Sequence, residues 1–332
     1  MSVTLAGIKE AAARIHSIVR RTPVLTSRTL DERTGVQAFF KCENFQRGGA
    51  FKLRGAANFV YSIPKEDLHR GVVAFSSGNH AQAVAIAAKS VGVPATIVMP
   101  RDAPRSKLEA TRNYGASIVS YDRLTENREQ IGKRISDETG ATLVPPYDHE
   151  WIITGQGTAA VELLDEVPDL DTLVVCIGGG GLISGCATAA KELNPRIRII
   201  GVEPTDANDT YLSRREGHRV EIPPPTTIAD GLRSPKPGAI TFPIIQKLVD
   251  DIVLVTDDEM REMMKFFVTR MKIVVEPSGA AGPAAVLFER LPTRPQRVGV
   301  IVSGGNVDLE LLTGLSAQNN SLEHCNAGPT IQ

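Results

Sequence analysis

The chain has 332 residues, of which 42% are hydrophobic and 23% charged, and its net charge is −1. This composition is typical of a globular protein of about two domains, and it lacks the basic field of a nucleic-acid-binding protein. No apolar run reaches the roughly 18 residues of a membrane-spanning helix, and the charges within the first 21 residues do not fit a signal peptide. The scattered cysteines, at 42, 176, 186 and 325, form no CxxC pair, which indicates reduced thiols in a cytoplasmic protein.

Short apolar runs alternate with longer helical stretches from Gly71 onward. In order, the expected strands and helices are GVVAF (71–75), HAQAVAIAAKSVG (80–92), ATIVM (95–99), SKLEATRNYG (106–115), ASIVS (116–120) and ENREQIGKRISDETG (126–140). This alternation predicts βαβ units and a parallel sheet. The pattern restarts after Trp151, with strands expected in TLVVC (172–176), IRIIGVEP (197–204), DIVLVT (251–256) and RVGVIV (297–302).

These elements predict an α/β protein with two open, mostly parallel sheets. We expect residues 71–148 to form a small domain. Residues 1–70 and 149–315 would form a larger domain that is discontinuous in sequence. Residues 316–332 lack periodicity, and we expect a flexible tail there.

A run of four glycines, Gly178, Gly179, Gly180 and Gly181, follows one of the predicted strands. Without Cβ atoms, successive N–H groups can converge on an anion at a helix start. The run is not a Walker A motif, and Ile183 stands where the dinucleotide fingerprint needs its third glycine. A tight turn for close packing is the alternative, but it does not require four glycines. We therefore predict a phosphate site.

Two further strand ends carry polar side chains. FSSGNHAQ contains Ser76, Ser77, Asn79 and His80, and helix capping would account for only one of them. Together they indicate a site for a carboxylate or a ring hydroxyl. IVSGGN ends a strand at Ser303, whose hydroxyl is placed to meet a ligand heteroatom unless the segment is only a terminating turn. Open α/β sheets bind ligands beyond the carboxyl ends of their strands, so we expect these turns at one site.

The segment GGAFKLRGAANF (48–59) places Lys52 among small and apolar neighbours. Lys52 is either a surface lysine on an amphipathic helix or a nucleophile with a perturbed pKa. A phosphate cradle, a reactive lysine and a hydroxyl for a ring nitrogen are what pyridoxal phosphate requires. The three motifs together favour the nucleophile.

The motifs AFKLRGA, SSGNHAQ, GGGGLISG and SGGN, in this order and across most of the chain, resemble the fold-type II pyridoxal-phosphate enzymes. The chain most resembles the group that contains serine/threonine dehydratases, serine racemases and 3-hydroxyaspartate dehydratases. The resemblance implies a tryptophan-synthase-β-like fold, with the cofactor in the cleft between a large cofactor-binding domain and a small domain. It also implies a homodimer.

The same resemblance assigns cofactor-binding roles. Lys52 would carry pyridoxal 5′-phosphate covalently, Phe51 would lie against its ring, and Asn79 would bind the ring 3-hydroxyl. The four glycines of the run would hold the phosphate through their backbone N–H groups. Ser303 would bind the pyridine nitrogen, and a neutral partner there leaves the ring a weaker electron sink.

The resemblance also places an amino-acid substrate. Its α-carboxylate would lie against Ser76, Asn79 and His80. Lys52 would remove the α-proton on one face. Ser77 matches the residue that works from the opposite face in serine racemases, so racemisation is possible.

Arg128, in the segment TENREQ, aligns with an arginine of serine racemases and 3-hydroxyaspartate dehydratases that reaches the substrate's β-substituent. A guanidinium suits a β-carboxylate because it can pair with both oxygens. On residue type alone, Arg128 would lie on a solvated helix face. Ala50 supports this branch of the family, since many threonine dehydratases have serine there.

The segment GVEPTDAND contains Glu203, Ala207 and Asp209. Two carboxylates and a backbone carbonyl make an oxygen site suited to Mg²⁺, Mn²⁺ or Ca²⁺. From sequence alone, a solvated acidic loop is the commoner explanation. The resemblance favours the divalent cation, because metal-binding members carry Glu and Asp at matching positions.

Taken together, these features predict a lyase that eliminates water from L-threonine, L-serine or 3-hydroxyaspartate to give a 2-oxo acid and ammonia. Within the family, the alternatives are a hydroxyaspartate-selective dehydratase and a serine racemase with elimination as a side activity. A dinucleotide-dependent oxidoreductase would leave Lys52 and Ser303 without roles. A non-catalytic ligand-binding protein stays open.

Overall fold

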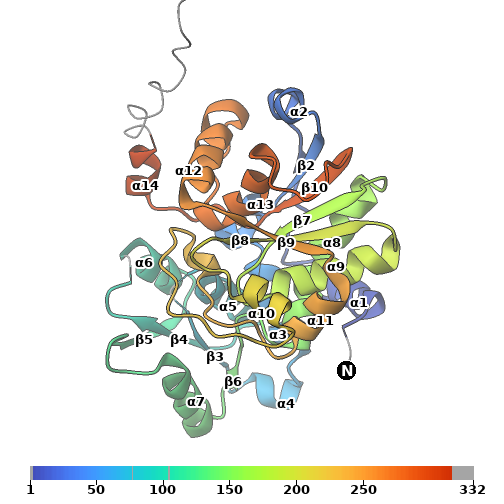
Figure 1. Cartoon of the computed structure of the whole chain (residues 1–332). Coiled ribbons are helices and arrows are strands. Elements are labelled where there is room, and N and C mark those ends of the chain that lie inside the picture. The colour runs from blue at the N-terminus through green and yellow to red at the C-terminus, as the bar shows by residue number, and fades with distance from the viewer. Residues whose placement is uncertain (1–2, 77, 104, 316–332) are drawn as a thin grey trace, which may run out of the picture.

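The computed structural model describes residues 3–76, 78–103 and 105–315, and its strands form two sheets (Figure 1). The larger sheet has the order β1-β2-β10-β7-β8-β9, and the smaller has the order β5-β4-β3-β6. Among the described strands only the β1–β2 pair is antiparallel. The strands are β1 (Val24–Leu25), β2 (Gln37–Cys42), β3 (Val72–Phe75), β4 (Ala95–Pro100), β5 (Ser117–Tyr121), β6 (Thr142–Leu143), β7 (Thr172–Cys176), β8 (Arg198–Pro204), β9 (Asp251–Val255) and β10 (Arg297–Val302).

Helices join the strands and cover the sheets (Figure 1). Their ends follow local sequence signals: Thr256 and Glu259 form a capping box at the start of α12, and α7 ends at Gly140 in the left-handed region, with φ 72°. The α-helices are α1 (Leu5–Ile15), α2 (Arg28–Thr34), α3 (Lys52–Ser62), α4 (Lys65–Leu68), α5 (Asn79–Ser90), α6 (Arg105–Asn113), α7 (Arg128–Thr139), α8 (Glu150–Glu166), α9 (Gly181–Leu193), α10 (Asp209–Glu216), α11 (Thr241–Leu248), α12 (Asp257–Phe266), α13 (Pro277–Leu287) and α14 (Leu309–Gly314). Short 3₁₀ turns lie at η1 (Glu43–Phe45), η2 (Arg47–Gly49) and η3 (Asp230–Leu232), and a π-helical turn at η4 (Phe267–Met271).

The predicted fold class is confirmed, since both sheets are open and almost wholly parallel. Strand β7 is buried at every position, as expected for a parallel strand with helices on both faces. No strand is predicted before Gly71, yet β2 pairs with β10 in the larger sheet, with Phe40 opposite Val300. The segment that leads to Lys52 is therefore anchored in the larger sheet.

Two main apolar cores lie around the two sheets. The core around the smaller sheet also takes in Leu53, Phe59 and Ile152, which lie outside residues 71–148. The domain boundaries therefore stay a prediction, and the expected tail at 316–332 lies outside the described residues. Within the part of the chain that the structure describes, no helix is long and apolar enough to cross a membrane.

Candidate active site

The carboxyl ends of β3, β7 and β10 meet at one cavity of about 510 Å³, a volume typical of small-molecule sites. Side chains from both sheets line it. Ser77 lies outside the described residues. The structure brings the other predicted cofactor and substrate residues together at this cavity: Phe51, Lys52, Ser76, Asn79, His80, Arg128, Gly178, Gly179, Gly180, Gly181 and Ser303.

Lys52 is the first residue of α3, and the backbone before it is tied to the end of β10. The Phe51 N–H donates to the Ser303 carbonyl at 3.0 Å. Residues 53–60 of the helix are all buried, so α3 is not an amphipathic surface helix. The Lys52 amine donates to the Pro146 carbonyl at 2.7 Å. Burial lowers the pKa of the Lys52 amine to about 8, although nearby Glu276 opposes this shift. The nucleophile interpretation is therefore supported.

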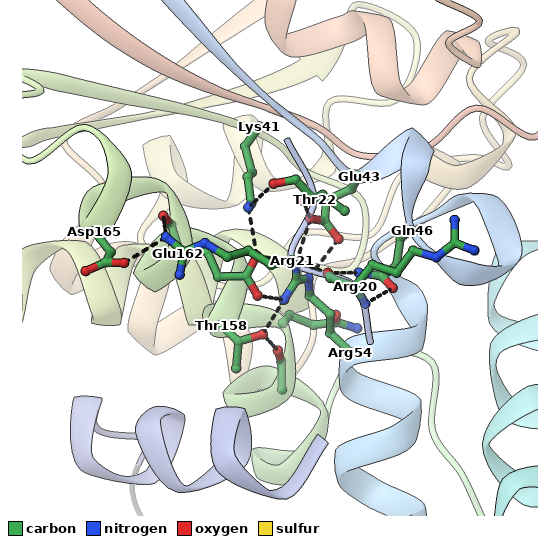
Figure 2. A network of polar contacts seen from close by, with 12 residues as sticks. Arg20, Arg21, Thr22, Lys41, Glu43, Gln46, Arg54, Thr158, Glu162 and Asp165 are labelled. Carbon is green, nitrogen blue, oxygen red and sulfur yellow. Dashed lines mark hydrogen bonds and ion pairs between the residues drawn. The ribbon is translucent and has the colours of Figure 1, made fainter. Parts of the chain in front are cut away.

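A buried ionic network is centred on Arg54, which lies on α3 two residues after Lys52 (Figure 2). The Arg54 guanidinium donates to both carboxylate oxygens of Glu43, at 2.7 and 2.9 Å, and to both of Glu162, at 2.7 and 2.8 Å. Lys41 lies 2.7 Å from Glu162 and completes a balanced set of two cations and two anions. Burial alone would lower the pKa of Arg54, but Glu43 and Glu162 raise it above its usual value. The network joins β2, η1, α3 and α8.

The glycine turn between β7 and α9 is shaped by close neighbours. A Cβ on Gly179 would lie 2.4 Å from ring atoms of Tyr147, and a Cβ on Gly178 would lie 2.9 Å from the Gly231 carbonyl. Gly180 has φ 90° and forms the N-cap of α9, which has no side-chain cap among the described residues. The first-turn N–H groups of α9 are thus left for an anion, and the turn fits a phosphate group.

The start of α5 presents Asn79 to the cavity. The N-cap of this helix is Gly78, without a side-chain cap, so capping does not explain Asn79. Its Nδ2 donates to Glu276 at 2.8 Å, and its Oδ1 accepts from Asn306 at 2.8 Å. These two bonds fix the orientation of the amide. Asn79 is therefore held in one position at the cavity wall.

His80 and Ser76 flank this helix start. The His80 Nε2 lies 3.1 Å from the Val144 carbonyl, which can only accept, so Nε2 carries the proton. Burial, with a contribution from the Lys52 charge, lowers the pKa of His80 to about 3. The imidazole is thus neutral and cannot attract a carboxylate by charge. The Ser76 hydroxyl accepts from the Gly78 N–H at 3.2 Å and keeps its own proton for a ligand.

Ser303 follows β10 and is almost fully buried. Its side chain lies beside the Cys176 thiol at the end of β7, the strand next to β10. Burial raises the pKa of Cys176 to about 11, so the thiol is neutral. A ligand heteroatom beside Ser303 would therefore contact two neutral groups, the Ser303 hydroxyl and the Cys176 thiol. The family resemblance implies a neutral partner of this kind for the pyridine nitrogen.

Arg128 is the first residue of α7 and lies at the exposed rim of the cavity. The centre of its guanidinium lies 5.7 Å from the centroid of the Phe75 ring, a cation–π distance. Phe75 ends β3 and immediately precedes the turn that contains Ser76. Arg128 is thus exposed, as its residue type suggests, and still lines the site.

Glu203 and Asp209 lie away from the cavity and are fully buried, so a solvated acidic loop is wrong. Both oxygens of Glu203 accept backbone N–H groups from the start of α10, whereas neither oxygen of Asp209 has a hydrogen-bond partner among the described residues. Burial raises the pKa of both carboxyl groups well above the usual range, and the Glu203 charge raises that of Asp209 further. Ala207, between them, is also buried. An orphaned buried carboxylate of this kind fits a bound cation.

Several cavity residues carry no signal in the sequence that would mark them as part of the site. Glu276 ends an apolar run just before Pro277, and Tyr147 lies in the segment PPYDHE between β6 and α8. Ser303 is predicted because it follows the end of a strand. Neither Glu276 nor Tyr147 follows a strand directly, since both come after irregular backbone. The remaining missed residues that line the cavity include Cys176, Arg233 and Ser234.

The comparisons with known proteins agree with this geometry. The matching family model is described as "Pyridoxal-phosphate dependent enzyme" and covers residues 15–304. The L-threo-3-hydroxyaspartate ammonia-lyase of Saccharomyces cerevisiae is 51% identical over 328 residues, 99% of each chain. The serine racemase of Schizosaccharomyces pombe is 48% identical over 91% of this chain and 94% of its own.

Among solved structures, maize serine racemase superimposes with a TM-score of 0.91 at 46% sequence identity. The match covers 96% of this chain and 98% of the maize chain. The family model covers the residues that form the cavity, and relatives are about 50% identical over nearly the whole chain. The fold is also that of a solved relative. All three findings identify the same family. The chain belongs to the pyridoxal-phosphate-dependent enzymes, as a lyase of the fold-type II architecture.

Proposed function

We propose that the protein is an ammonia-lyase that eliminates water from β-hydroxy amino acids, with 3-hydroxyaspartate as the preferred substrate. The observation that carries this proposal is that Lys52, with its lowered pKa, and Arg128 line one cavity. An amine suited to proton transfer and a guanidinium suited to a second carboxylate match a hydroxylated dicarboxylic amino acid. The yeast relative named for this substrate supports the choice.

The cavity would hold the cofactor through groups from both sheets. When bound, pyridoxal phosphate makes the substrate's α-proton acidic by withdrawing electrons from Cα. The glycine turn before α9 would bind the phosphate, and Lys52 would hold the cofactor covalently. Asn79 would bind the ring 3-hydroxyl, Ser303 the ring nitrogen, and Phe51 would lie against the ring.

The turn before α5 would bind the substrate's α-carboxylate through Ser76, Asn79 and the N–H groups at the helix start. Since His80 is neutral and bonded to the Val144 carbonyl, its contribution is to hold this turn in place. Ser77 would serve as the base on the opposite face if the enzyme also racemises serine.

Elimination follows from removal of the α-proton. Lys52 would take that proton, and the β-hydroxyl would leave with a proton as water. In the released enamine a proton moves from nitrogen to Cβ to give the imine, and water hydrolyses the imine to a 2-oxo acid and ammonia. One water leaves and one enters, so substrate and products balance. Exclusion of bulk water from the partly enclosed cavity would protect the proton on Lys52 from exchange.

A divalent cation is proposed at Glu203, Asp209 and the Ala207 carbonyl. The orphaned Asp209 carboxyl group supports it, because a buried carboxyl with a raised pKa gives up its proton at neutral pH when a cation neutralises the charge. The cation would stabilise the loop between β8 and α10. A homodimer in the cytoplasm is proposed on the family resemblance, and light scattering on the purified protein measures the dimer directly.

Turnover assays test the proposed function. The purified holoenzyme should release ammonia and a 2-oxo acid from L-threo-3-hydroxyaspartate faster than from L-serine or L-threonine, and Lys52→Ala should release none. Chiral analysis of the serine reaction measures D-serine in parallel. Faster formation of D-serine than of ammonia from any substrate would identify a racemase instead. If none of the three amino acids is turned over, the protein is not the proposed lyase.

A further inference from the structure

Positively charged side chains predominate around the cavity. Among the described residues, its lining contains Lys52 and three arginines, Arg123, Arg128 and Arg233, but only two acidic residues, Asp230 and Glu276. Lys52 and the glycine turn belong to the cofactor. A lining arginine without an ion pair to a described residue is therefore suited to distinguish one anionic substrate from another.

The three arginines are not equivalent. Arg123 pairs with Asp102 at 2.9 Å, so its charge is already compensated. Arg128 lies over the Phe75 ring and makes no ion pair with any described residue. Arg233 likewise makes no ion pair with a described residue. Two guanidinium groups that have no ion pair with a described residue thus line the same cavity.

Arg233 is held in place by its own segment. Its Nε donates to the Thr227 carbonyl at 2.7 Å. The next residue, Ile228, donates its N–H to Asp257 at 3.0 Å, and the Thr227 hydroxyl donates to the same carboxylate. Thr227 is fully buried. With Nε anchored to a fixed carbonyl, the outer nitrogens of Arg233 remain for a ligand in the cavity.

Arg128 and Arg233 come from different parts of the fold. Arg128 starts α7, which packs on the smaller sheet, whereas Arg233 follows η3, between β8 and α11 of the larger sheet. A carboxylate accepts up to about four hydrogen bonds, enough for two guanidinium groups. A ligand that engages both residues would therefore bridge the two parts.

We propose that Arg233 is a second specificity residue, which binds the distal carboxylate of a dicarboxylic substrate together with Arg128. This inference rests on the proposed function and extends it to a residue outside the family motifs found in the sequence. Serine and threonine lack the distal carboxylate and gain nothing from Arg233. Arg128 on one side of the cavity and Arg233 on the other thus both favour dicarboxylic substrates over serine and threonine.

Calorimetric binding to the holoenzyme tests the proposal without turnover. The probes are succinate, which has the four-carbon dicarboxylate skeleton of aspartate, and butyrate, its monocarboxylate counterpart. Arg233→Gln should weaken succinate binding by about 10- to 100-fold, as expected for loss of a charge-assisted bond, and leave butyrate binding unchanged. Arg233→Lys should bind succinate with intermediate affinity. Arg261→Gln is the matched control, because Arg261 pairs with Asp258 outside the cavity lining, and this variant should bind both probes like the wild type.

Three outcomes would overturn the proposal: no succinate binding by the wild type, equal succinate affinity in wild type and Arg233→Gln, or an equal loss for butyrate. The melting temperature of each variant shows whether it is folded. Steady-state assays then give the fold-change in kcat/KM, which should fall for hydroxyaspartate and stay constant for serine. If the wild type turns over no hydroxyaspartate, the proposed function fails, while the succinate measurement still decides the role of Arg233.

Discussion

The Lys52 amine donates to the carbonyl of Pro146 at 2.7 Å, across 94 residues of sequence. This bond joins the start of α3 to the segment before α8. The next residue in that segment, Tyr147, lies against Gly179. Lysine, connecting segment and glycine turn therefore pack as one unit, and the chemistry of the amine depends on all three.

The lowered pKa of Lys52 predicts the pH dependence of cofactor incorporation. Only the neutral amine attacks an aldehyde, and with a pKa of about 8 its neutral fraction grows about tenfold per pH unit below 8 and levels off above. The rate of covalent pyridoxal-phosphate incorporation into apoenzyme should follow this curve in stopped-flow absorbance. A rate that still climbs tenfold per unit between pH 9 and 10 would show an ordinary lysine. Lys52→Arg is the control and should incorporate none covalently.

The contact between Gly179 and Tyr147 predicts a rescue experiment. A methyl group at Gly179 would lie 2.4 Å from the Tyr147 ring, so Gly179→Ala should displace the turn or the ring and weaken cofactor binding at least about tenfold. Truncation in Gly179→Ala/Tyr147→Ala removes the clash and should restore part of the affinity, measured by equilibrium titration of apoenzyme. If the double variant binds no better than Gly179→Ala, the ring does not set the shape of the turn.

The ionic network beneath α3 predicts a large loss of stability when it is broken. Arg54→Met leaves Glu43 buried without its cation and should cost about 3–5 kcal/mol in the free energy of unfolding. Arg21→Met is the control, because the pair of Arg21 with Asp165 is more than half exposed on both sides, at 53% and 68%, and contributes about 1 kcal/mol or less. Chemical denaturation measures both, and similar losses for the two variants would contradict this account.

The cation site predicts that one substitution has opposite effects with and without metal. In EDTA, at a pH high enough to ionise Asp209, Asp209→Asn should raise the melting temperature, because it removes a buried charge that lacks a hydrogen-bond partner among the described residues. With millimolar Mg²⁺ the wild type should gain stability by ligand binding and the variant should not. Asp206→Asn, at an exposed position on the same loop, should respond to Mg²⁺ like the wild type. A wild type insensitive to EDTA, Mg²⁺, Mn²⁺ and Ca²⁺ would exclude the site.

Much of the fold follows from periodicity, because parallel strands buried on both faces read as continuous apolar runs. The runs at 95–99 and 251–256 become β4 and β9 with shifts of a residue at their ends. Strand β2 is missed because its apolar residues are few and followed by the charged Lys41 and Glu43. Both charges are buried only because they take part in the Arg54 network, a tertiary effect that no local pattern contains.

The parts of the candidate site that directly follow a predicted strand can be predicted from the sequence. The glycine turn, Ser303 and the turn before α5 are of this kind. Tyr147 and Glu276 reach the cavity from irregular segments, so their positions depend on the packing of whole helices. The burial of Asp209 is equally a property of the assembled core, which is why residue type alone suggests a solvated loop there.

Substrate preference is the most direct test of the central claim, that this cavity is built for a hydroxylated dicarboxylic amino acid. The measurement is the ratio of kcat/KM for L-threo-3-hydroxyaspartate to that for L-serine, in wild type and Arg128→Gln holoenzyme. We predict a ratio well above one in the wild type. Loss of one charge-assisted carboxylate contact should lower it by about 10- to 100-fold in Arg128→Gln, with serine turnover retained. A ratio that is the same in both proteins, or below one in the wild type, would contradict the account.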